Sequence, residues 1–358
     1  IPNLVPLMNK ENTNTDVIIV GSGISGLILS NRLKEKKVDH VVLERVAKRK
    51  TLEIPETLPP STLVLLESLN LLELFKKSSS KTFGYDSLWN SDTVTTDNFF
   101  DHNPYKYGLK LNKKELLNDL RKLVIDNVVP FNNLIEIGRS DETVTVKIES
   151  NNEVQTITGR VVVDATGRNR AVLKHLGVAS NSFDDQIALS CHLPYFKHPK
   201  LIHRVFVELF ENGWGIVSSL NEQINGMTLY TKKRSPILPQ LKDYGNWKEL
   251  LSNTKLLKDF LSDDLERKVI GGKANSSKAL QITGSNWLAI GDAAMAFDPL
   301  SSHGISNAIY CANVASNAIE SYVANDTIAT FQNYDDTICE IFNEYLKQKS
   351  KLYDMDNR

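Results

Sequence analysis

The clearest pattern of apolar and polar positions lies in residues 16–44. A short β-branched run, DVIIV, is followed by the glycine turn GSGISG, by the amphipathic stretch LILSNRLKEKK and by a second apolar run, DHVVLE. Apolar runs bounded by turn residues are typical of buried strands, and the stretch between them has helical spacing. The pattern therefore predicts a strand–helix–strand unit, which begins a parallel sheet.

Later segments repeat both kinds of pattern. Helical spacing recurs in residues 59–77, where Pro60 and Ser61 suit a helix start, and in residues 113–127, 246–268, 306–325 and 327–353. Residues 143–159 alternate on either side of SNNE, which predicts a hairpin, and the buried strand RVVVDATG follows. The runs QIALSCHL, HRVFVELF, WGIVSSL and GMTLYT are strands at short spacing, which indicates an antiparallel sheet in the middle of the chain.

Composition narrows the class of protein. The 358 residues carry a formal net charge of −1, so we expect no nucleic-acid partner. No apolar run reaches the roughly 18 residues of a membrane helix, so no transmembrane segment is predicted. Three cysteines without CxxC spacing, Cys191, Cys311 and Cys339, favour a reduced, cytoplasmic protein over a disulfide framework or a zinc site. We predict no metal site.

The first 14 residues differ from the rest of the chain. They lack the long apolar segment of a signal peptide, and we expect them to be poorly ordered. Met8, followed by polar residues, is expected to be the native start, which would make residues 1–7 a remnant of cloning.

GSGISG matches the dinucleotide-binding pattern GxGxxG, between a predicted strand and a predicted helix. Gly21 allows the tight turn, Gly23 lets a pyrophosphate approach the backbone, and Gly26 lets the helix pack on the strand. The start of the helix offers free N–H groups to the phosphates. Glu44 ends the second strand, where its carboxylate can accept hydrogen bonds from an adenosine ribose. The sequence therefore predicts a dinucleotide site.

This pattern alone does not separate NAD from FAD, but the stretch GDAAMAFDPLSSHGISNAI (residues 291–309) does. Asp292 follows a predicted strand and is placed to accept hydrogen bonds from the ribitol chain, which FAD has and NAD lacks. After Pro299, Gly304 begins a helix whose N–H groups would face the flavin. A helix dipole there favours the anionic reduced ring by up to about 2 kcal/mol. The stretch favours FAD; an ordinary helix cap is the alternative interpretation.

A third segment, DATG (Asp164, Thr166 and Gly167), follows a buried strand. GxGxxG, DATG and GDAA, in this order, resemble the FAD-dependent monooxygenases of the p-hydroxybenzoate hydroxylase fold, a superfamily that includes flavin-dependent halogenases and geranylgeranyl reductases. Further stretches resemble the flavoproteins that mature tryptophan-derived quinone cofactors by modifying peptidyl tryptophan. They are PETLPPSTLVLLESLNLLELF, FGYDSLWNSD, NPYKYGLKLNKKELLNDL, NGWGIVSSL, ANSSKAL and GDAAMAFDPLSSHGI.

The resemblance implies an α/β (α+β) fold: a discontinuous Rossmann-like FAD-binding domain, an inserted antiparallel β-sheet domain for the substrate, and a C-terminal helical tail. The expected FAD-binding domain comprises residues 15–80, 105–178 and 275–325, the substrate domain residues 81–104 and 179–274, and the C-terminal helices residues 326–358. The residues expected to bind FAD are Gly21, Gly23, Ile24, Ser25, Gly26, Glu44, Arg45, Lys113, Asp164, Thr166, Gly167, Gly291, Asp292, Pro299, Gly304 and Ile305.

The activity implied is hydroxylation of an electron-rich aromatic substrate, either a small molecule or a tryptophan side chain in a peptide or protein. It would proceed through a flavin C4a-hydroperoxide, with NAD(P)H as electron donor. Asp298 could orient a substrate N–H or act as a base, His303 could shuttle protons, and Ser302 would lie beside the flavin. An Asp before a proline is also a common turn acceptor. Trp214 and Trp89 are candidate substrate contacts, with core packing as the alternative.

Two positions depart from the relatives. His303 stands where the subgroup usually has a glutamine, and Lys113 where many relatives carry an arginine that contacts the flavin. Three other activities stay open: a halogenase, although the chain lacks its Trp-x-Trp-x-Ile-Pro segment; an isoprenoid reductase, which needs a long apolar tunnel; and a flavin-binding module without turnover.

Overall fold

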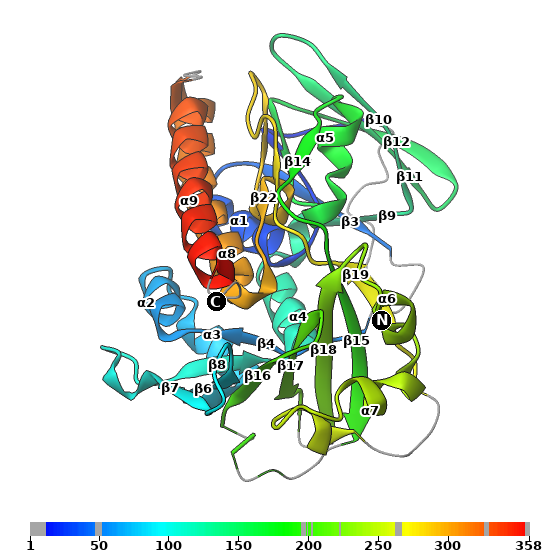
Figure 1. Cartoon of the computed structure of the whole chain (residues 1–358). Coiled ribbons are helices and arrows are strands. Elements are labelled where there is room, and N and C mark those ends of the chain that lie inside the picture. Colours follow the sequence, from blue (N-terminus) through cyan, green and yellow to red (C-terminus); the bar gives the residue numbers. More distant parts are fainter. Residues whose placement is uncertain are drawn as a thin grey trace.

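The computed structural model describes residues 12–46, 52–194, 198, 200–201, 203–221, 223–261, 267–325 and 329–354 (Figure 1). Residues 1–7 and Met8, for which the sequence leads to the predictions above, lie outside the described residues. Residues 12–14 form strand β1 (Asn12–Asn14), which pairs in parallel with β12 (Glu153–Gly159). The expectation that residues 1–14 are poorly ordered is therefore wrong for these three, because a neighbouring strand supplies hydrogen bonds that the polar sequence NTN does not announce.

A five-stranded parallel sheet in the order β21-β13-β2-β3-β9 carries the predicted strand–helix–strand unit. Its strands are β2 (Val17–Val20), β3 (His40–Arg45), β9 (Val128–Phe131), β13 (Val161–Asp164) and β21 (Trp287–Ala289). Every residue of β2 and β13 is buried, which is why both read as continuous apolar runs instead of alternating ones. Helix α1 (Ile24–Glu35) packs on this sheet and against α8 (Gly304–Asn325).

A four-stranded sheet in the order β1-β12-β11-β10 flanks the parallel one. Strands β11 (Val144–Ser150) and β12 form the predicted hairpin, and β10 (Asn133–Arg139) precedes it. Val144, Val146 and Ile148 are fully buried and belong to the same core as β2. The alternation of apolar and polar residues in β11 thus reflects one face that is buried and one that points outward.

The predicted antiparallel insertion is a seven-stranded sheet in the order β19-β15-β18-β17-β16-β6-β7. Its strands are β6 (Gly84–Leu88), β7 (Thr95–Asn98), β15 (Gln186–Pro194), β16 (Val205–Phe210), β17 (Gly213–Ser219), β18 (Ile224–Lys232) and β19 (Ile270–Lys273). All neighbours are antiparallel except β16 and β6. Helices α6 (Leu238–Leu241) and α7 (Trp247–Leu250) add a second core on this sheet.

Two small sheets and four helices complete the connections between these layers. The sheets consist of β4 (Glu56–Leu58), β8 (Gly108–Leu111) and β5 (Ser79–Thr82), and of β14 (Ser180–Ser182), β20 (Ser277–Ala279) and β22 (Met295–Ala296). The helices are α2 (Pro60–Ser68), α3 (Leu72–Lys77), α4 (Lys113–Leu123) and α5 (Ala171–His175). The single helix predicted for residues 59–77 is interrupted at Asn70, whose φ is +56°. In residues 246–268, the described part holds only α7 and a short turn at Lys258–Phe260.

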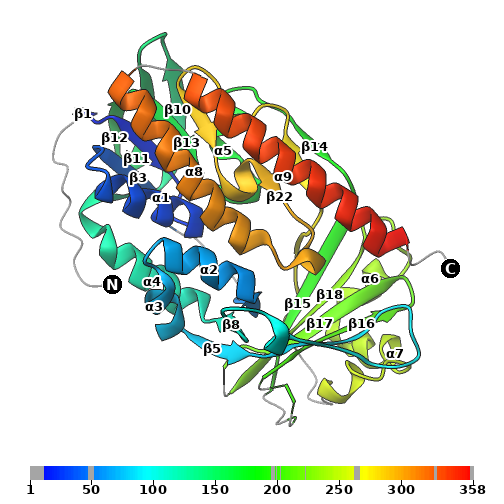
Figure 2. The ribbon, with the colours of Figure 1, turned by 90° about the vertical axis from the view of Figure 1, so that its left-hand side faces the viewer.

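The predicted C-terminal tail is one long helix, α9 (Ala329–Asp354), which runs alongside α8 (Figure 2). Near its start, the Tyr334 hydroxyl donates to the Ala289 carbonyl in β21 at 2.8 Å. Near its end, the Tyr353 hydroxyl donates to Gln186 Oε1 in β15 at 3.3 Å. Helix α9 therefore bridges the parallel and the seven-stranded sheets. None of the helices in the described ranges is long and apolar enough to span a bilayer.

Candidate functional site

The glycine turn after β2 is shaped by close backbone approaches. Gly21 has a φ of +115°, and a Cβ there would lie 2.4 Å from the Ala165 carbonyl oxygen. A Cβ on Gly26 would lie 2.0 Å from the Gly21 carbonyl oxygen. Gly23, the residue before α1, has no atom within 4 Å of its Cβ position. Two glycines thus permit strand and helix to touch, and the middle one leaves open space at the helix start.

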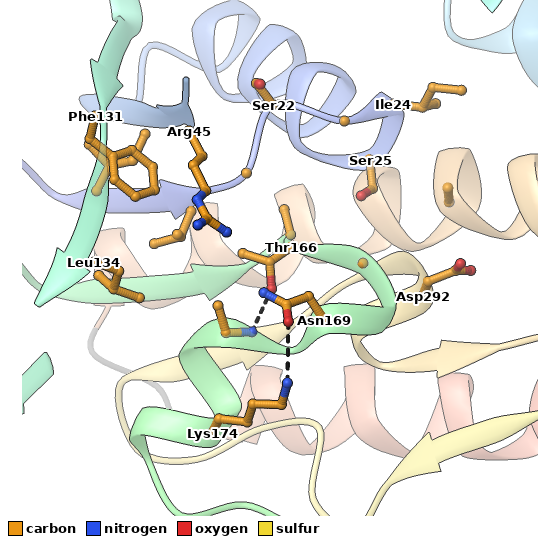
Figure 3. A pocket seen from close by; sticks show the side chains of 18 of the residues that line it. Ser22, Ile24, Ser25, Arg45, Phe131, Leu134, Thr166, Asn169, Lys174 and Asp292 are labelled. Atoms are coloured by element: carbon orange, nitrogen blue, oxygen red, sulfur yellow. Dashed lines mark hydrogen bonds between the residues drawn. The ribbon is translucent and has the colours of Figure 1, made fainter. Parts of the chain in front are cut away.

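A cavity of about 870 Å³ lies along the carboxyl ends of the parallel strands (Figure 3). It extends from Phe131 and Leu134 at one end to Asp292 at the other, past the start of α1 and the Thr166 loop. The sequence-predicted residues that line it are Gly21, Gly23, Ile24, Ser25, Arg45, Lys113, Thr166, Gly167, Asp292, Gly304 and Ile305. Three distant segments therefore meet in one cavity.

Four other predicted cofactor residues lie behind this wall. Both oxygens of the fully buried Asp164 accept backbone bonds, from Thr166 at 2.9 Å and from Leu173 at 2.9 Å. Burial raises the pKa of Asp164, although these bonds oppose the rise. Its role is to shape the Thr166 loop. Gly26 and Gly291 serve close packing, since a Cβ on Gly291 would lie 3.1 Å from Ser25 Oγ.

Glu44 also lies behind the cavity. Its Oε1 accepts a hydrogen bond from Ser22 Oγ at 2.8 Å and forms an ion pair with Arg121. This carboxylate therefore holds the glycine turn to α4, and the pairing with Arg121 escapes sequence reasoning because 77 residues separate the two.

Charged side chains gather around Asp292. Arg168 Nε lies 3.4 Å from Asp292 Oδ2, and Lys113 Nζ lies 3.1 Å from Glu56 Oε1. Burial raises the pKa of the Asp292 carboxyl, and Arg168, Lys113 and Arg170 oppose the rise. Glu56 Oε2 is buried and has no hydrogen-bond partner among the described residues. The sequence analysis missed Arg168 and Glu56, although Arg168 directly follows DATG and Glu56 is the second residue of the PETLPPS stretch.

A second cavity, of about 260 Å³, lies between the loop 297–302 and the seven-stranded sheet. It shares four wall residues with the first cavity: Glu56, Asp292, Gly304 and Ile305. The remaining wall includes Tyr85, Ile216, Tyr230, Phe297, Pro299 and Ser302. The two cavities therefore adjoin at the start of α8.

The three predicted catalytic residues occupy different environments on this loop. Ser302 lines the second cavity in a left-handed conformation, with φ +52°, and its Oγ accepts a bond from the Tyr85 hydroxyl at 3.3 Å. His303 is exposed, its ring is bonded to the Ser301 carbonyl, and it lines a third cavity, between the loop and α9. The structure thus does not bring His303 to the wall that Ser302 forms.

Asp298 is 2% exposed and is engaged within the protein. Its Oδ1 accepts the Leu300 amide at 2.8 Å, and its Oδ2 accepts the Tyr353 hydroxyl at 3.0 Å. Lys349 Nζ lies 3.3 Å from the same Oδ2. These contacts agree with the interpretation of Asp298 as a turn acceptor. Both of its carboxylate oxygens have partners, so neither is free to act as a base.

Trp214 and Trp89 pack against each other and line neither of the two adjoining cavities. The Trp214 ring stacks on Tyr230 with centroids 3.9 Å apart, and Trp89 meets it edge-on at 5.9 Å. Trp214 is 4% exposed, and its Nε1 donates to Gln186 Oε1 at 3.4 Å. The structure therefore favours core packing for both, while Tyr230 presents the aromatic face to the cavity.

This architecture matches a known class of protein. The family described as "FAD binding domain" matches residues 14–316, so the chain belongs to this family of FAD-dependent oxidoreductases. The FAD-dependent oxidoreductase LodB of Marinomonas mediterranea is 24% identical over 351 residues, which cover 96% of this chain and 94% of that protein. The resemblance inferred from the three motifs is confirmed at the level of family and fold.

Solved structures agree on the fold. The flavin-dependent halogenase CmlS superposes with a TM-score of 0.82 at 20% identity, covering 95% of this chain; this chain spans 64% of CmlS, less than two thirds of its length. The peptidyl tryptophan dihydroxylase QhpG superposes with a TM-score of 0.74 at 18% identity, covering 96% of this chain and 76% of QhpG.

The residues present fit FAD. The open space at Gly23 admits a pyrophosphate against the helix start, where backbone N–H groups and the dipole favour anions. At the far end, the first turn of α8 lies where the two cavities adjoin. Asp292 lines the same end of the cavity, where its carboxylate could accept hydrogen bonds from a ribitol chain. A volume of about 870 Å³ falls within the range of ligand sites, roughly 300–1,000 Å³.

Proposed function

We propose that this chain is an FAD-dependent monooxygenase that takes electrons from NAD(P)H and hydroxylates an electron-rich aromatic ring. The observation that carries this proposal is the wall shared by the two cavities, formed by Glu56, Asp292, Gly304 and Ile305. A ring in the second cavity would lie directly against the end of the cofactor cavity. Such adjacency is what positions two reactants for transfer between them.

When bound, reduced FAD supplies the activation of molecular oxygen. The chain's own contribution at the shared wall is electrostatic. N–H groups in the first turn of α8, from Gly304, favour negative charge there by up to about 2 kcal/mol. Asp292 would accept hydrogen bonds from the ribitol chain, and Arg168 and Lys113 compensate its charge.

The second cavity suits a compact aromatic group. Tyr230, Ile216 and Phe297 give it apolar surfaces against which an aromatic ring can pack. Because Ser302 Oγ accepts from Tyr85, the Ser302 hydroxyl proton is available to a substrate acceptor. A volume of about 260 Å³ lies below the range of larger ligands and disfavours the long tunnel of an isoprenoid reductase.

The substrate we favour is a tryptophan side chain in a peptide or protein. This chain shares its fold with QhpG, which acts on peptidyl tryptophan, and that likeness supports this choice. Halogenation is the second candidate, supported by the fold it shares with the halogenase CmlS.

The test is turnover by the purified, FAD-loaded protein with NADH or NADPH, oxygen and a set of indoles, phenols and tryptophan-containing peptides. We expect one of these compounds to stimulate NAD(P)H oxidation and to gain the mass of one oxygen atom. Parallel reactions with chloride or bromide separate the two candidates, because a halogenase replaces a ring hydrogen by halogen. Reduction without oxygen or halogen incorporation would overturn both.

A further inference from the structure

Three side chains on the last turns of α9 converge on one residue of the loop that lines the second cavity. Tyr345, Lys349 and Tyr353 are spaced by four residues and so share a face of the helix. The Asp298 backbone N–H donates to the Tyr345 hydroxyl at 2.7 Å, and the Tyr353 hydroxyl donates to Asp298 Oδ2 at 3.0 Å. Lys349 Nζ lies 3.3 Å from that oxygen. Helix α9 thus holds Asp298 through these three side chains.

Asp298 in turn organises the loop. Its Oδ1 accepts the Leu300 amide at 2.8 Å, and its carbonyl accepts the Ser301 hydroxyl at 2.8 Å. The short turn Pro299–Ser301 follows, and it leaves Ser302 in the left-handed conformation beside the second cavity. A shift of Asp298 would therefore move Pro299 and Ser302, which form the cavity wall.

The same α9 residues also contact the start of β15 and the residue before β20, behind the opposite wall of that cavity. Lys349 pairs with Asp184, just before β15, and donates to Ser276 Oγ at 2.7 Å. Tyr353 donates to Gln186 in β15 at 3.3 Å. The helix end thus joins the loop to the seven-stranded sheet, and both are walls of the second cavity.

We propose that Lys349 and Tyr353 are positioning residues, which act through Asp298 to fix the distance between the loop 297–302 and the seven-stranded sheet. The assignment rests on the proposed function, because it takes the second cavity to be the substrate site. A buried carboxylate that loses its cation or its hydroxyl donor is left poorly compensated. Lys349 stays charged at neutral pH: burial lowers its pKa, but Asp298 and Asp184 raise it further, so the net shift is upward.

The test compares Lys349→Met and Tyr353→Phe with a matched control, Lys347→Met. Lys347 lies on the same helix and is exposed, and among the described residues its one ion pair is with Glu344, at 3.6 Å, so its loss removes the same charge with little structural consequence. The first readout is amide hydrogen exchange of Leu300, Ser301 and Ser302 in FAD-loaded protein. We expect it to be about tenfold faster in both variants, equivalent to ~1.4 kcal/mol of local stability, and unchanged in Lys347→Met.

Kinetics supply the second readout. In both variants the KM for the aromatic substrate should rise about tenfold while FAD affinity stays constant, because no cofactor-cavity residue is touched. Unchanged exchange at the three loop amides would overturn the positioning role, whatever the kinetics. Faster exchange without turnover of any aromatic compound, in the unmodified protein as well, would support the positioning role and contradict the proposed function. Tyr353→Phe keeps the ring that Trp89 contacts, so it tests the hydroxyl alone.

Discussion

The two adjoining cavities are built in different ways. The cofactor cavity lies at the ends of the parallel strands and is lined by the motifs that follow them, at Gly21, Thr166 and Asp292. The second cavity is walled by larger side chains from β6, β17, β18 and the loop 297–302, and this loop is held by α9. The cofactor cavity is thus assembled from short motifs that can each be recognised in the sequence, whereas the second cavity depends on contacts between side chains of distant elements.

This difference has a physical consequence for mutations. On the cofactor side an added Cβ meets backbone atoms at Gly21 and Gly26, so the wall cannot yield. At the second cavity, the proposed substrate site, the wall position depends on hydrogen bonds and ion pairs at Asp298, which can weaken without unfolding the chain. Cofactor-side changes should thus act on FAD binding, and substrate-side changes on KM.

The largest expected effect is that of Gly23→Val. The Cβ position of Gly23 is open, so the side chain clashes with nothing in the protein but occupies the space of the pyrophosphate. We expect FAD affinity to fall about a hundredfold or more, or ~2.8 kcal/mol, with the melting temperature of the FAD-free protein nearly unchanged. Flavin titration and thermal melting measure the two quantities. Gly272→Val, at an open position in β19, is the matched control and should keep full affinity. Full affinity in Gly23→Val would refute the placement of the pyrophosphate.

The motifs that line the cofactor cavity can be recognised in the sequence because each of them is a short local stretch. A Cβ on Gly26 would meet the Gly21 carbonyl oxygen within the same turn, whereas a Cβ on Gly21 would meet the backbone of Ala165, which follows β13. Asp164 shows the limit: its position after a buried strand was correct, but both oxygens are used by the loop it precedes.

The substrate side escaped prediction because its contacts join residues far apart in sequence. Asp298 and Tyr353 are 55 residues apart, and no periodicity in either segment records their hydrogen bond. Trp214 was a reasonable candidate as an aromatic residue on the inserted sheet, but the strand register pairs it with Tyr230 in the core. Directly opposite residues lie on the same face of a sheet, so the strand pattern does not distinguish Trp214 from Tyr230; the packing of Trp89 against Trp214, which no strand pattern records, does.

Asp292→Asn is a second test of the cofactor cavity and should have an intermediate effect on FAD affinity. We expect FAD affinity to fall about tenfold, because a neutral amide accepts hydrogen bonds from the ribitol less strongly than a carboxylate. The FAD-free variant should melt at a higher temperature at neutral pH. Arg168 keeps bonds to the Asn275 and Phe297 carbonyls, so the substitution leaves it partnered.

The pH dependence of that gain follows from the raised pKa of Asp292. The folded state binds this proton more tightly than the unfolded chain does. The destabilisation caused by the charged carboxylate is therefore present in full only above the pKa of the folded state. The advantage of Asp292→Asn should therefore shrink as the pH falls toward the ordinary Asp value of about 3.9. A melting-temperature difference that grows on acidification would contradict the raised pKa.

The smallest expected effect is that of His303→Gln. The imidazole is exposed and does not line the second cavity, so FAD affinity should be unchanged and kcat/KM should stay within about twofold, under ~0.5 kcal/mol. Ser302→Ala on the same loop is the contrasting variant, since it removes a cavity-lining hydroxyl and the acceptor of Tyr85, and its kcat/KM should fall about tenfold. Steady-state kinetics on both proteins measures the ratio. If His303→Gln instead lost activity more than Ser302→Ala, His303 would have to reach the substrate in turnover. The loop would then need a second position, which the contacts of Asp298 with α9 oppose.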